Sequence, residues 1–388
     1  MRVPRSVASC HNAEFLLAAA ALERTEGLPG GGIRTTDAGI RRPIVGVRAR
    51  NSFHRNNADV FNDSPGEIVS NIFYFEDFPV GKSFDFGHYE VSEAQIISFG
   101  KAFDPRPPHS GPAPLQAGSE PTASPWQACA ILMRLNYDGW MLRAAARGAP
   151  GVDEVRWLQP VRAGLVLSGR ACVLNARISH SKPDIGFVQF RYELIADHIG
   201  PVMVQTNYVM LVRRVTNNSP VSVRAERKDS ELAAPPLATS CEIPEDWTEK
   251  VVGRNIEIGA TEFNAGSIVE FARAYDPQPF HVDETAAKNG PFGALAASGW
   301  HTASSWMRAF VIACQKSHAV PETLISISDL RWLRPVCVGD RIAWHFMPIA
   351  ISTSETGGMI VTSRNSGTNQ NAVKVYEFTA KILISHRK

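Results

Sequence analysis

The sequence has little of three things that would quickly assign it to a class: cysteine, net charge and long hydrophobic runs. Its six cysteines form no close pair and no metal-ligand spacing, which argues against a disulfide framework and indicates buried thiols in a reducing compartment. The formal charge is +2, from 40 basic and 38 acidic residues, so no broad surface for nucleic acid or an anionic membrane is expected. We therefore expect a cytoplasmic protein with no nucleic-acid or membrane partner.

The longest apolar run near the start, residues 15–22, is far shorter than the ~20 residues of a membrane-spanning helix. Arg2 and Arg5 precede this run as in a signal peptide, but Glu14 adjoins it and no clear cleavage site follows. The early segment is also rich in arginine and free of lysine, as in an organellar transit peptide. Because residues 1–70 show no sustained period, we predict a disordered leader, or a start codon assigned too far upstream.

What the chain has instead is an internal repeat. With 388 residues, of which 44% are hydrophobic and 20% charged, it can bury two cores. Asp-Pro-x-Pro-x-His occurs twice, and so does Arg-Trp-Leu-x-Pro-Val-x-x-Gly; the copies lie at 104–109 and 276–281, and at 156–164 and 331–339. The nearly constant offset predicts a tandem duplication. The expected division is a leader (1–70), a first domain (71–214), a Pro- and Asn-rich linker (215–245) and a second domain (246–388).

Hydrophobic periodicity predicts the same kind of unit in each copy. A change from a helical period to a period of two marks a central helix followed by long strands. The expected helices begin at Ser92, Pro125, Ser267 and Ser298, and the expected strands span 83–91, 155–161, 165–178, 185–196, 202–213, 326–336, 341–352, 359–364 and 372–385. One long helix against one long antiparallel sheet, doubled, is an α+β architecture.

Asp276 and His281 form the candidate catalytic pair, because a carboxylate and an imidazole can do acid and base work. Pro277 and Pro279 push Asp276 and Gln278 out of the helical region, so we expect the segment to be extended or turned and not helical. Five extended residues would span roughly 17 Å. The two groups can therefore share one substrate atom only if the chain folds back between them.

These motifs, with the run from Phe292 to His301, resemble the MaoC-like acyl dehydratases, a hot-dog-fold family that includes the R-specific enoyl-CoA hydratases. The resemblance covers residues 74–386. It implies two hot-dog units in one chain that imitates the dimer of single-unit relatives, as a monomer or a higher homo-oligomer. It also implies that Asp276 and His281 activate a water, that Ser298 helps to hold the acid, and that the N–H near Gly299 faces the thioester oxygen.

The chemistry that the resemblance implies needs no cofactor and no metal. An alternative interpretation takes His281 and Asp283 as two ligands of an iron facial triad, with His301, His318 or His345 as the third. The first copy argues against it, since His109 is followed there by Ser-Gly. Apart from that alternative, we interpret His301 as a core or helix-start residue. We interpret Trp157 and Trp332 as packing residues. Gln278 stands where relatives usually have Asn, so the positioning of the pair could differ in detail.

The two copies are expected to be unequal. Asp104 and His109 repeat the candidate pair, but Pro125 stands where the second copy has Gly299, and proline has no N–H for an oxyanion. We therefore predict a degenerate first site that shapes the pocket of the second.

The sequence thus predicts a hydratase or dehydratase of 2-enoyl and 3-hydroxyacyl thioesters, carried by CoA or by an acyl-carrier protein. Two alternatives remain open: a non-catalytic protein that binds acyl thioesters, and a hot-dog thioesterase. The substrate-binding candidates are Ser298, Gly299 and Gln278.

Overall fold

The structure, a computed structural model, describes residues 72–111, 120–214, 243, 251–315, 319–355 and 358–386. The predicted leader (1–70) and, apart from Ile243, the predicted linker (215–245) lie outside this range. None of the helices in the described ranges is long and apolar enough to cross a membrane.

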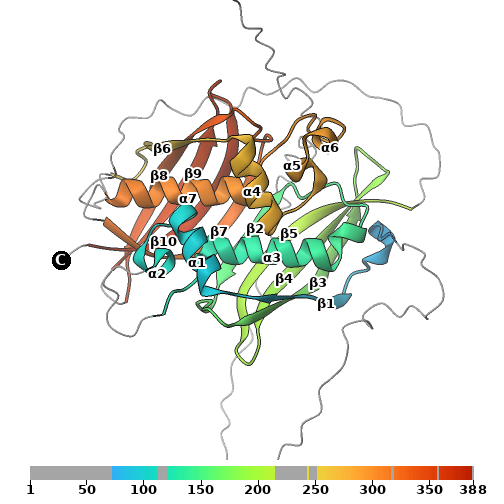
Figure 1. Ribbon diagram of the computed structural model, residues 1–388, viewed down its shortest axis with the longest axis horizontal. Coiled ribbons are helices and arrows are strands. Elements are labelled where there is room, and N and C mark those ends of the chain that lie inside the picture. The colour runs from blue at the N-terminus through green and yellow to red at the C-terminus, as the bar shows by residue number, and fades with distance from the viewer. Residues whose placement is uncertain are drawn as a thin grey trace, which may run out of the picture.

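One antiparallel sheet dominates the described part of the chain (Figure 1). Its strand order is β1-β3-β4-β5-β2-β7-β10-β9-β8-β6. The first half supplies β1 (Ser83–Glu90), β2 (Gly151–Trp157), β3 (Val166–Ile178), β4 (Ile185–Ala196) and β5 (Gly200–Val212). The second half supplies β6 (Ile256–Glu262), β7 (Ala319–Trp332), β8 (Arg341–Thr353), β9 (Met359–Thr368) and β10 (Lys374–His386).

Helices cover one face of this sheet, with the two longest, α3 and α7, lying across it (Figure 1). The first half contains α1 (Glu93–Phe103), α2 (Pro107–Ser110) and α3 (Pro125–Gly139), and the second contains α4 (Ala265–Tyr275), α5 (Pro279–Val282), α6 (Glu284–Lys288) and α7 (Gly299–Gln315). Short 3₁₀ turns span Phe75–Asp77 and Met141–Arg143. Ser92 and Asn264 start α1 and α4 by accepting a backbone N–H with their side chains, as N-cap residues do.

The two halves have the same topology. In each, the strand order from the outer edge inward is first, third, fourth, fifth and second in sequence, and β2 pairs with β7 to join the halves. Side chains repeat the symmetry: Nη1 of Arg134 on α3 donates to the carbonyl of Arg273 (2.8 Å), and Nη1 of Arg308 on α7 donates to that of Lys101 (2.9 Å). The long helix α3 is therefore hydrogen-bonded to the end of α4 in the other half, and α7 to the end of α1.

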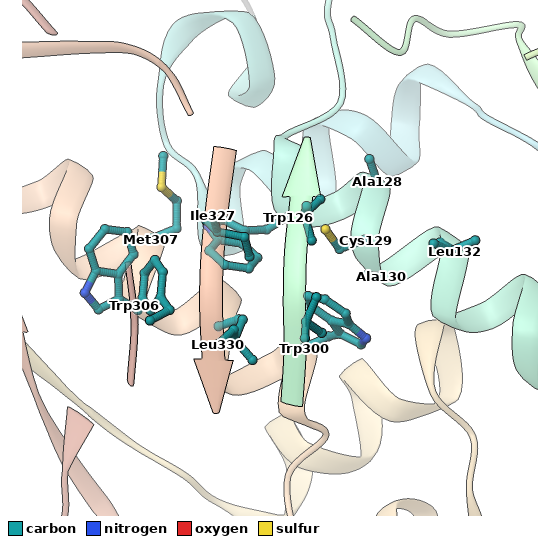
Figure 2. Close-up of a cluster of buried hydrophobic side chains, with 14 of the residues drawn as sticks. Trp126, Ala128, Cys129, Ala130, Leu132, Trp300, Trp306, Met307, Ile327 and Leu330 are labelled. Carbon is teal, nitrogen blue, oxygen red and sulfur yellow. The ribbon is translucent and has the colours of Figure 1, made fainter. Parts of the chain in front are cut away.

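The core is continuous across the junction of the halves. Figure 2 shows Trp126 and Trp300 beside the central strands, together with Ile327 and Leu330 of β7. The two indole rings lie 6.2 Å apart, and both are buried. Replacing a buried aromatic side chain of this size by alanine typically costs about 3–5 kcal/mol. The halves therefore share one core and do not merely touch.

Candidate active site

A helix end and a single helical turn bring Asp276 and His281 together. Asp276 follows the last residue of α4, where its φ of −151° lies outside the helical region. The one-turn helix α5 then carries His281. As a result, Nε2 of His281 lies 3.5 Å from Oδ2 of Asp276, and both side chains are buried. The chain folds back between them, as the sequence argument requires for a shared substrate atom.

The expectation that no helix forms here is wrong for residues 279–282. Proline fits the first position of a helix, because the N–H it lacks would have no intrahelical acceptor there. Gln278, which precedes Pro279, is extended with ψ of 140°, as a residue before proline should be. The first half repeats the arrangement in α2, which begins at Pro107.

Hydrogen bonds orient both members of the pair. Ser298 Oγ donates to Oδ2 of Asp276 (2.7 Å), and Nε2 of Gln278 donates to Oδ1 (2.9 Å). Nδ1 of His281 lies 2.7 Å from the carbonyl oxygen of Ala296. Because a carbonyl oxygen only accepts, Nδ1 carries a proton, and Nε2 is the ring nitrogen on the side of Asp276. Both members of the pair are therefore held in place by hydrogen bonds, with Nε2 beside the carboxylate.

The start of α7 lies next to this pair. Ser298 immediately precedes the helix, and its Oγ accepts the N–H of Trp300 at 3.2 Å. The first intrahelical bond runs from Thr302 N–H to Ser298 O, so the N–H of Gly299 precedes the helical hydrogen-bond pattern. The positive end of the helix dipole adds to the field at this point. This helix start therefore offers a place where negative charge is stabilised.

Gly299 is needed at this position for a reason that the sequence argument did not give. A Cβ built on Gly299 would come within 2.4 Å of the ring of Trp332, far inside van der Waals contact. Nε1 of Trp332 also donates to the carbonyl oxygen of Gly299 at 3.1 Å. The first half repeats this bond between Trp157 and Pro125 at 2.9 Å. Both tryptophans thus pack against a helix start, and the indole of Trp332 fills the space that Gly299 leaves.

A cavity of about 560 Å³ contains the pair and is lined by both halves of the chain. The second half contributes the carboxylate, the imidazole, Gly299 and Trp332. The cavity's exposed lining residues include Arg147 of the first half and Asn289 and Pro291 of the second, and we take them as the mouth. The buried lining residues of the first half are the polar Asn136, Tyr192, Gln205 and Asn207 and the apolar Val152, Val209 and Met210, and we take them as the closed end. Sequence reasoning expected the first half to shape the pocket but named none of these residues.

His301 lies in the first turn of α7 but does not reach this cavity's lining. Its ring stacks on Phe271 at 4.8 Å and meets Phe103 of the first half edge-on at 5.6 Å. Burial, with a smaller contribution from nearby His281, lowers the pKa of His301 to about 3. It is therefore a neutral core residue at ordinary pH.

The first half holds a second copy of the constellation. Ser124 Oγ donates to Oδ2 of Asp104 at 2.6 Å, and Nε2 of His109 lies 3.7 Å from the same oxygen. Nδ1 of His109 lies 2.7 Å from the carbonyl oxygen of Thr122. The three side chains therefore reproduce the second site closely.

Arg106 sets the first site apart. It stands at the position of Gln278 and contacts both oxygens of Asp104, at 2.6 and 2.7 Å. Burial favours a raised pKa for Asp104, but the guanidinium, with His109 and Ser124, outweighs this effect and lowers that pKa. Nη1 of Arg106 also donates to the carbonyl of Glu322 in β7 at 3.0 Å. The first carboxylate is thus occupied by an ion pair that the sequence argument overlooked, although a charged residue between two prolines was visible.

The counterpart of the cavity's closed end is filled with aromatic side chains. Trp126 and Trp300 align α3 with α7, and this alignment places Phe310 where the first half has Asn136. The strand pairs Trp157–Met203 and Trp332–Tyr376 align β5 with β10, and place Phe378 where the first half has Gln205. Both rings are buried, and Trp306 stacks on Phe310 at 5.1 Å. The first site therefore faces packed aromatic side chains of the second half. The second site, in contrast, faces the cavity that residues of the first half line.

The metal alternative finds no support in the geometry. Oδ1 of Asp283 accepts the N–H of Ala286 and so caps α6, and this residue is exposed whereas His281 is buried. Across the part of the chain that the structure describes, no three His, Cys, Asp or Glu side chains group as metal ligands. His318 lies outside that part.

Comparison with known proteins points to one family. The family model described as "MaoC like domain" matches residues 248–363, which include Asp276 and His281. A MaoC-like dehydratase from Rhodospirillum rubrum is 34% identical, over 35% of this chain and 94% of the other, with a TM-score of 0.31. Comparison with curated proteins gives no match.

Two solved structures match the chain across both halves. A MaoC domain protein from Chloroflexus aurantiacus, assigned as a dehydratase, is 17% identical, covers 83% of this chain and 100% of its own, and has a TM-score of 0.65. A conserved hypothetical protein of Mycobacterium tuberculosis, described as a double hotdog fold, is 15% identical, covers 82% and 100%, and has a TM-score of 0.55. At these identities the likeness shows the fold alone, which is the double hot-dog.

The family follows from the sequence match. The Rhodospirillum rubrum dehydratase is identical at 34% of aligned positions across nearly its whole length. The family model independently covers the segment that holds the buried acid and imidazole. The chain therefore belongs to the MaoC-like dehydratase family.

Proposed function

We propose that the protein is a hydratase or dehydratase that adds water to a 2-enoyl thioester or removes it from a 3-hydroxyacyl thioester. The observation that carries the proposal is the convergence of Asp276, His281 and the start of α7 on one cavity. Acid-base chemistry on a thioester needs a base for water, a proton for C2 and donors for the carbonyl oxygen. The imidazole, the carboxylate and the helix start beside them support this assignment.

The proton transfers balance around Asp276 and His281. As the water oxygen bonds to C3, the pair takes one proton from the water, and the free Nε2 of His281 is positioned to accept it. The pair then delivers one proton to C2 and returns to its starting state. Positioned acid-base groups of this kind typically contribute about 10²- to 10⁴-fold to a rate. Ser298 and Gln278 hold the carboxylate in place during both steps.

The N–H of Gly299 would stabilise the charge that develops on the thioester oxygen. Its place ahead of the helical hydrogen-bond pattern and the dipole of α7 act in the same direction. Arg147 and Arg334, which line the cavity, are suited to the phosphate groups of the carrier, since guanidinium pairs with phosphate. CoA and an acyl-carrier protein both present such phosphate, so the proposal covers either carrier.

We also propose the division into a leader, two domains and a linker at the bounds expected from the sequence. One chain would act as a monomer that imitates a hot-dog dimer, or as a higher homo-oligomer, in the cytoplasm. Asp104 and His109 would then form a degenerate site, because Arg106 occupies the carboxylate and aromatic rings fill the space beyond it.

The test measures hydration of a short 2-enoyl-CoA by loss of the enoyl absorbance. Asp276→Asn should lower kcat by at least about 10²-fold, whereas Asp104→Asn should leave it nearly unchanged. Since Asp104→Asn leaves Arg106 buried without its ion pair, His281→Gln and His109→Gln provide a second matched pair with less risk to folding.

Three other outcomes would contradict parts of the proposal. Equal loss of kcat in both members of a pair would mean that both halves work, which contradicts the degenerate first site but not the hydratase activity. Tight binding of acyl-CoA without turnover would identify a thioester-binding protein. Release of free thiol from a saturated acyl-CoA would identify a thioesterase.

A further inference from the structure

The closed end of the cavity carries polar side chains among apolar ones, where an acyl chain would end. Gln205 and Asn207 lie on neighbouring inward-facing positions of β5 and are only 6% and 5% exposed. Asn136 of α3 and Tyr192 of β4 line the same end, and Tyr192 is directly opposite Gln205 in the strand pairing. Val152, Val209 and Met210 are buried apolar residues of the same lining, and an end that accepted only a hydrocarbon tail would need no polar side chains beside them.

The second half shows what these positions hold when no ligand space is present. Trp157 pairs with Met203 in the first half and Trp332 pairs with Tyr376 in the second, which fixes the correspondence of β5 with β10. Gln205 and Asn207 then match Phe378 and Ala380, which are buried and apolar. The fold therefore does not require carboxamides here, so their presence needs another explanation.

One of these carboxamides is left with an open hydrogen-bond position. Nε2 of Gln205 donates to Oδ1 of Asn207 at 2.9 Å, and Nδ2 of Asn207 donates to the carbonyl of Tyr208 at 3.3 Å. Asn136 is likewise bonded through both of its polar atoms, to Leu132 and Trp140. Oε1 of Gln205 is buried and has no partner among the described residues. A buried acceptor without a donor is destabilising unless a ligand supplies one.

We infer that Gln205, held by Asn207, binds a hydroxyl group on the acyl chain of the substrate, at the end away from the thioester. The inference rests on the proposed function, because it treats the cavity as the acyl site. A hydroxyl donates to Oε1, and it can accept from a neighbouring phenol or amide. A charged group is disfavoured, since none of the buried first-half residues that line the cavity carries a formal charge. Burial also raises the pKa of Tyr192 well above its usual value, so its phenol stays neutral.

The experiment compares ω-hydroxy 2-enoyl-CoA substrates, from butenoyl to octenoyl, with the unsubstituted substrate of the same length. At the preferred length, wild-type protein should favour the hydroxylated member by at least about tenfold in kcat/KM, because a site built to hydrogen-bond a hydroxyl rejects an analogue that lacks it. Gln205→Met, which keeps the side-chain length without the amide, should abolish or reverse that preference. Gln189→Met makes the same change at a position of β4 where the side chain bonds Asp153, and should leave the preference intact.

Binding of the saturated acyl-CoA pairs, measured by calorimetry, keeps this inference separate from the catalytic proposal. If neither enoyl substrate turns over but the hydroxylated saturated ligand binds at least about tenfold tighter, the proposed function fails and the hydroxyl site stands. If both turn over with no preference at any length, an ordered water satisfies Gln205 and the inference is overturned. A Gln205→Met protein that keeps the wild-type preference would overturn it equally. Should that variant not fold, the wild-type preference alone decides.

Discussion

Arg106 and Gln278 occupy equivalent positions after the aspartate of each half, and they hold it in different ways. Arg106 contacts both oxygens of Asp104, whereas Gln278 donates to one oxygen of Asp276. When both oxygens of an aspartate are bonded to one arginine, fewer of its lone pairs remain to accept a hydrogen bond from water. We therefore attribute much of the difference between the two sites to this one residue.

Gln278→Arg should silence the second site. The guanidinium should reach Asp276 as Arg106 reaches Asp104, and kcat should fall by about 10²-fold or more because the acid-base contribution is lost. Gln278→Met is the matched control: it removes the hydrogen bond without adding a charge and should cost less, about tenfold or below. Steady-state kinetics on the best enoyl-CoA measure both. A fully active Gln278→Arg protein would show that the arginine does not close a site.

His301 should affect stability against pH more than it affects catalysis. Its pKa is lowered to about 3 in the folded protein, mainly by burial, whereas an unfolded histidine titrates near 6.5. Between these values the unfolded chain binds the additional proton. The stability that the neutral ring contributes is therefore present above pH 6.5 and is lost as pH falls toward 3.

The matched change is His301→Gln, since Gln127 stands at the same place in α3. The slope of unfolding free energy against pH should become shallower by up to about 1.4 kcal/mol per pH unit in that window. His109, His345 and Asp104 are present in both proteins, so the difference isolates His301. Urea unfolding at several pH values provides the measurement, and parallel curves for the two proteins would contradict the prediction. Activity at neutral pH should stay within about threefold.

At the scale of elements, regular periodicity located most of the sheet, including the edge strand β1, but missed the strand at the other edge, β6. The predicted strands at 165–178, 185–196 and 341–352 differ from β3, β4 and β8 by at most one residue at either end. The strand β6 was not predicted, because Gly259 and only two buried isoleucines give it a weak alternating pattern. Among the strands that the structure describes, it lies at the sheet edge and pairs only with β8.

The predicted start of β7 was late for a related reason. The strand begins at Ala319 rather than Ser326, although it contains Pro321. Residues 319–324 pair with β10 alone, while β2 reaches only residues 326–331, so the early part of β7 has one unpaired edge. Proline is tolerated on such an edge, and a register shift occurs beside it. A sequence rule that excludes proline from strands cannot recognise this situation.

The candidate site was predictable where its parts are close in sequence. Asp276, His281 and Ser298 lie within one segment, and the repeat pointed to them. The closed end of the cavity comes from the other half, and no local pattern connects it to the pair. One signal was available: the alternating inward positions of β5 include Gln205 and Asn207 among apolar neighbours. Polar residues on an otherwise apolar strand face can therefore mark a ligand position.

Gly299→Ala should disturb the start of α7 as an element. The added Cβ would come within 2.4 Å of the Trp332 ring, so the indole must move and its hydrogen bond to Gly299 must weaken. Overpacking of this kind typically costs about 1–3 kcal/mol. We expect a lower melting temperature and a kcat reduced by about tenfold or more, since the N–H donor shifts with the helix start.

Pro125→Ala is the control in the first half. It leaves the Trp157 bond to this carbonyl available and lies away from the candidate pair, so kcat should hardly change. Circular dichroism melting and steady-state kinetics on both proteins give the comparison. If Gly299→Ala keeps wild-type kcat and melting temperature, Trp332 adapts to the methyl group and the geometric argument is wrong.

For the whole molecule, the predicted leader should be dispensable. Residues 1–70 lack the periodicity that a packed core needs, and the described fold begins at Ile72. A chain that starts at Asn71 should keep the melting temperature and kcat of the full chain within error. An insoluble or inactive product would show that the leader takes part in folding or catalysis.

In the proposed function the two halves have different roles: the second holds the candidate pair, and the first holds the closed end of its cavity. In the reverse arrangement, the pair Asp104 and His109 would work with a cavity end supplied by the second half. Two features oppose it: Arg106 contacts Asp104, and the buried rings of Phe310 and Phe378 fill the positions that correspond to the closed end. Restoring the chemistry of the first site should therefore not restore turnover. In an Asp276→Asn background, the combined changes Arg106→Gln and Pro125→Gly should give no activity above that background.

Turnover should appear only when Phe310→Asn and Phe378→Gln are added, because these copy the residues that surround open space in the first half. Each removes a buried ring at a cost of about 3–5 kcal/mol, so the melting temperature is measured first and activity is assayed well below it. The two aromatic changes alone, without Arg106→Gln and Pro125→Gly, serve as the control and should stay inactive. Activity from Arg106→Gln and Pro125→Gly alone would mean that the aromatic rings do not close the first site.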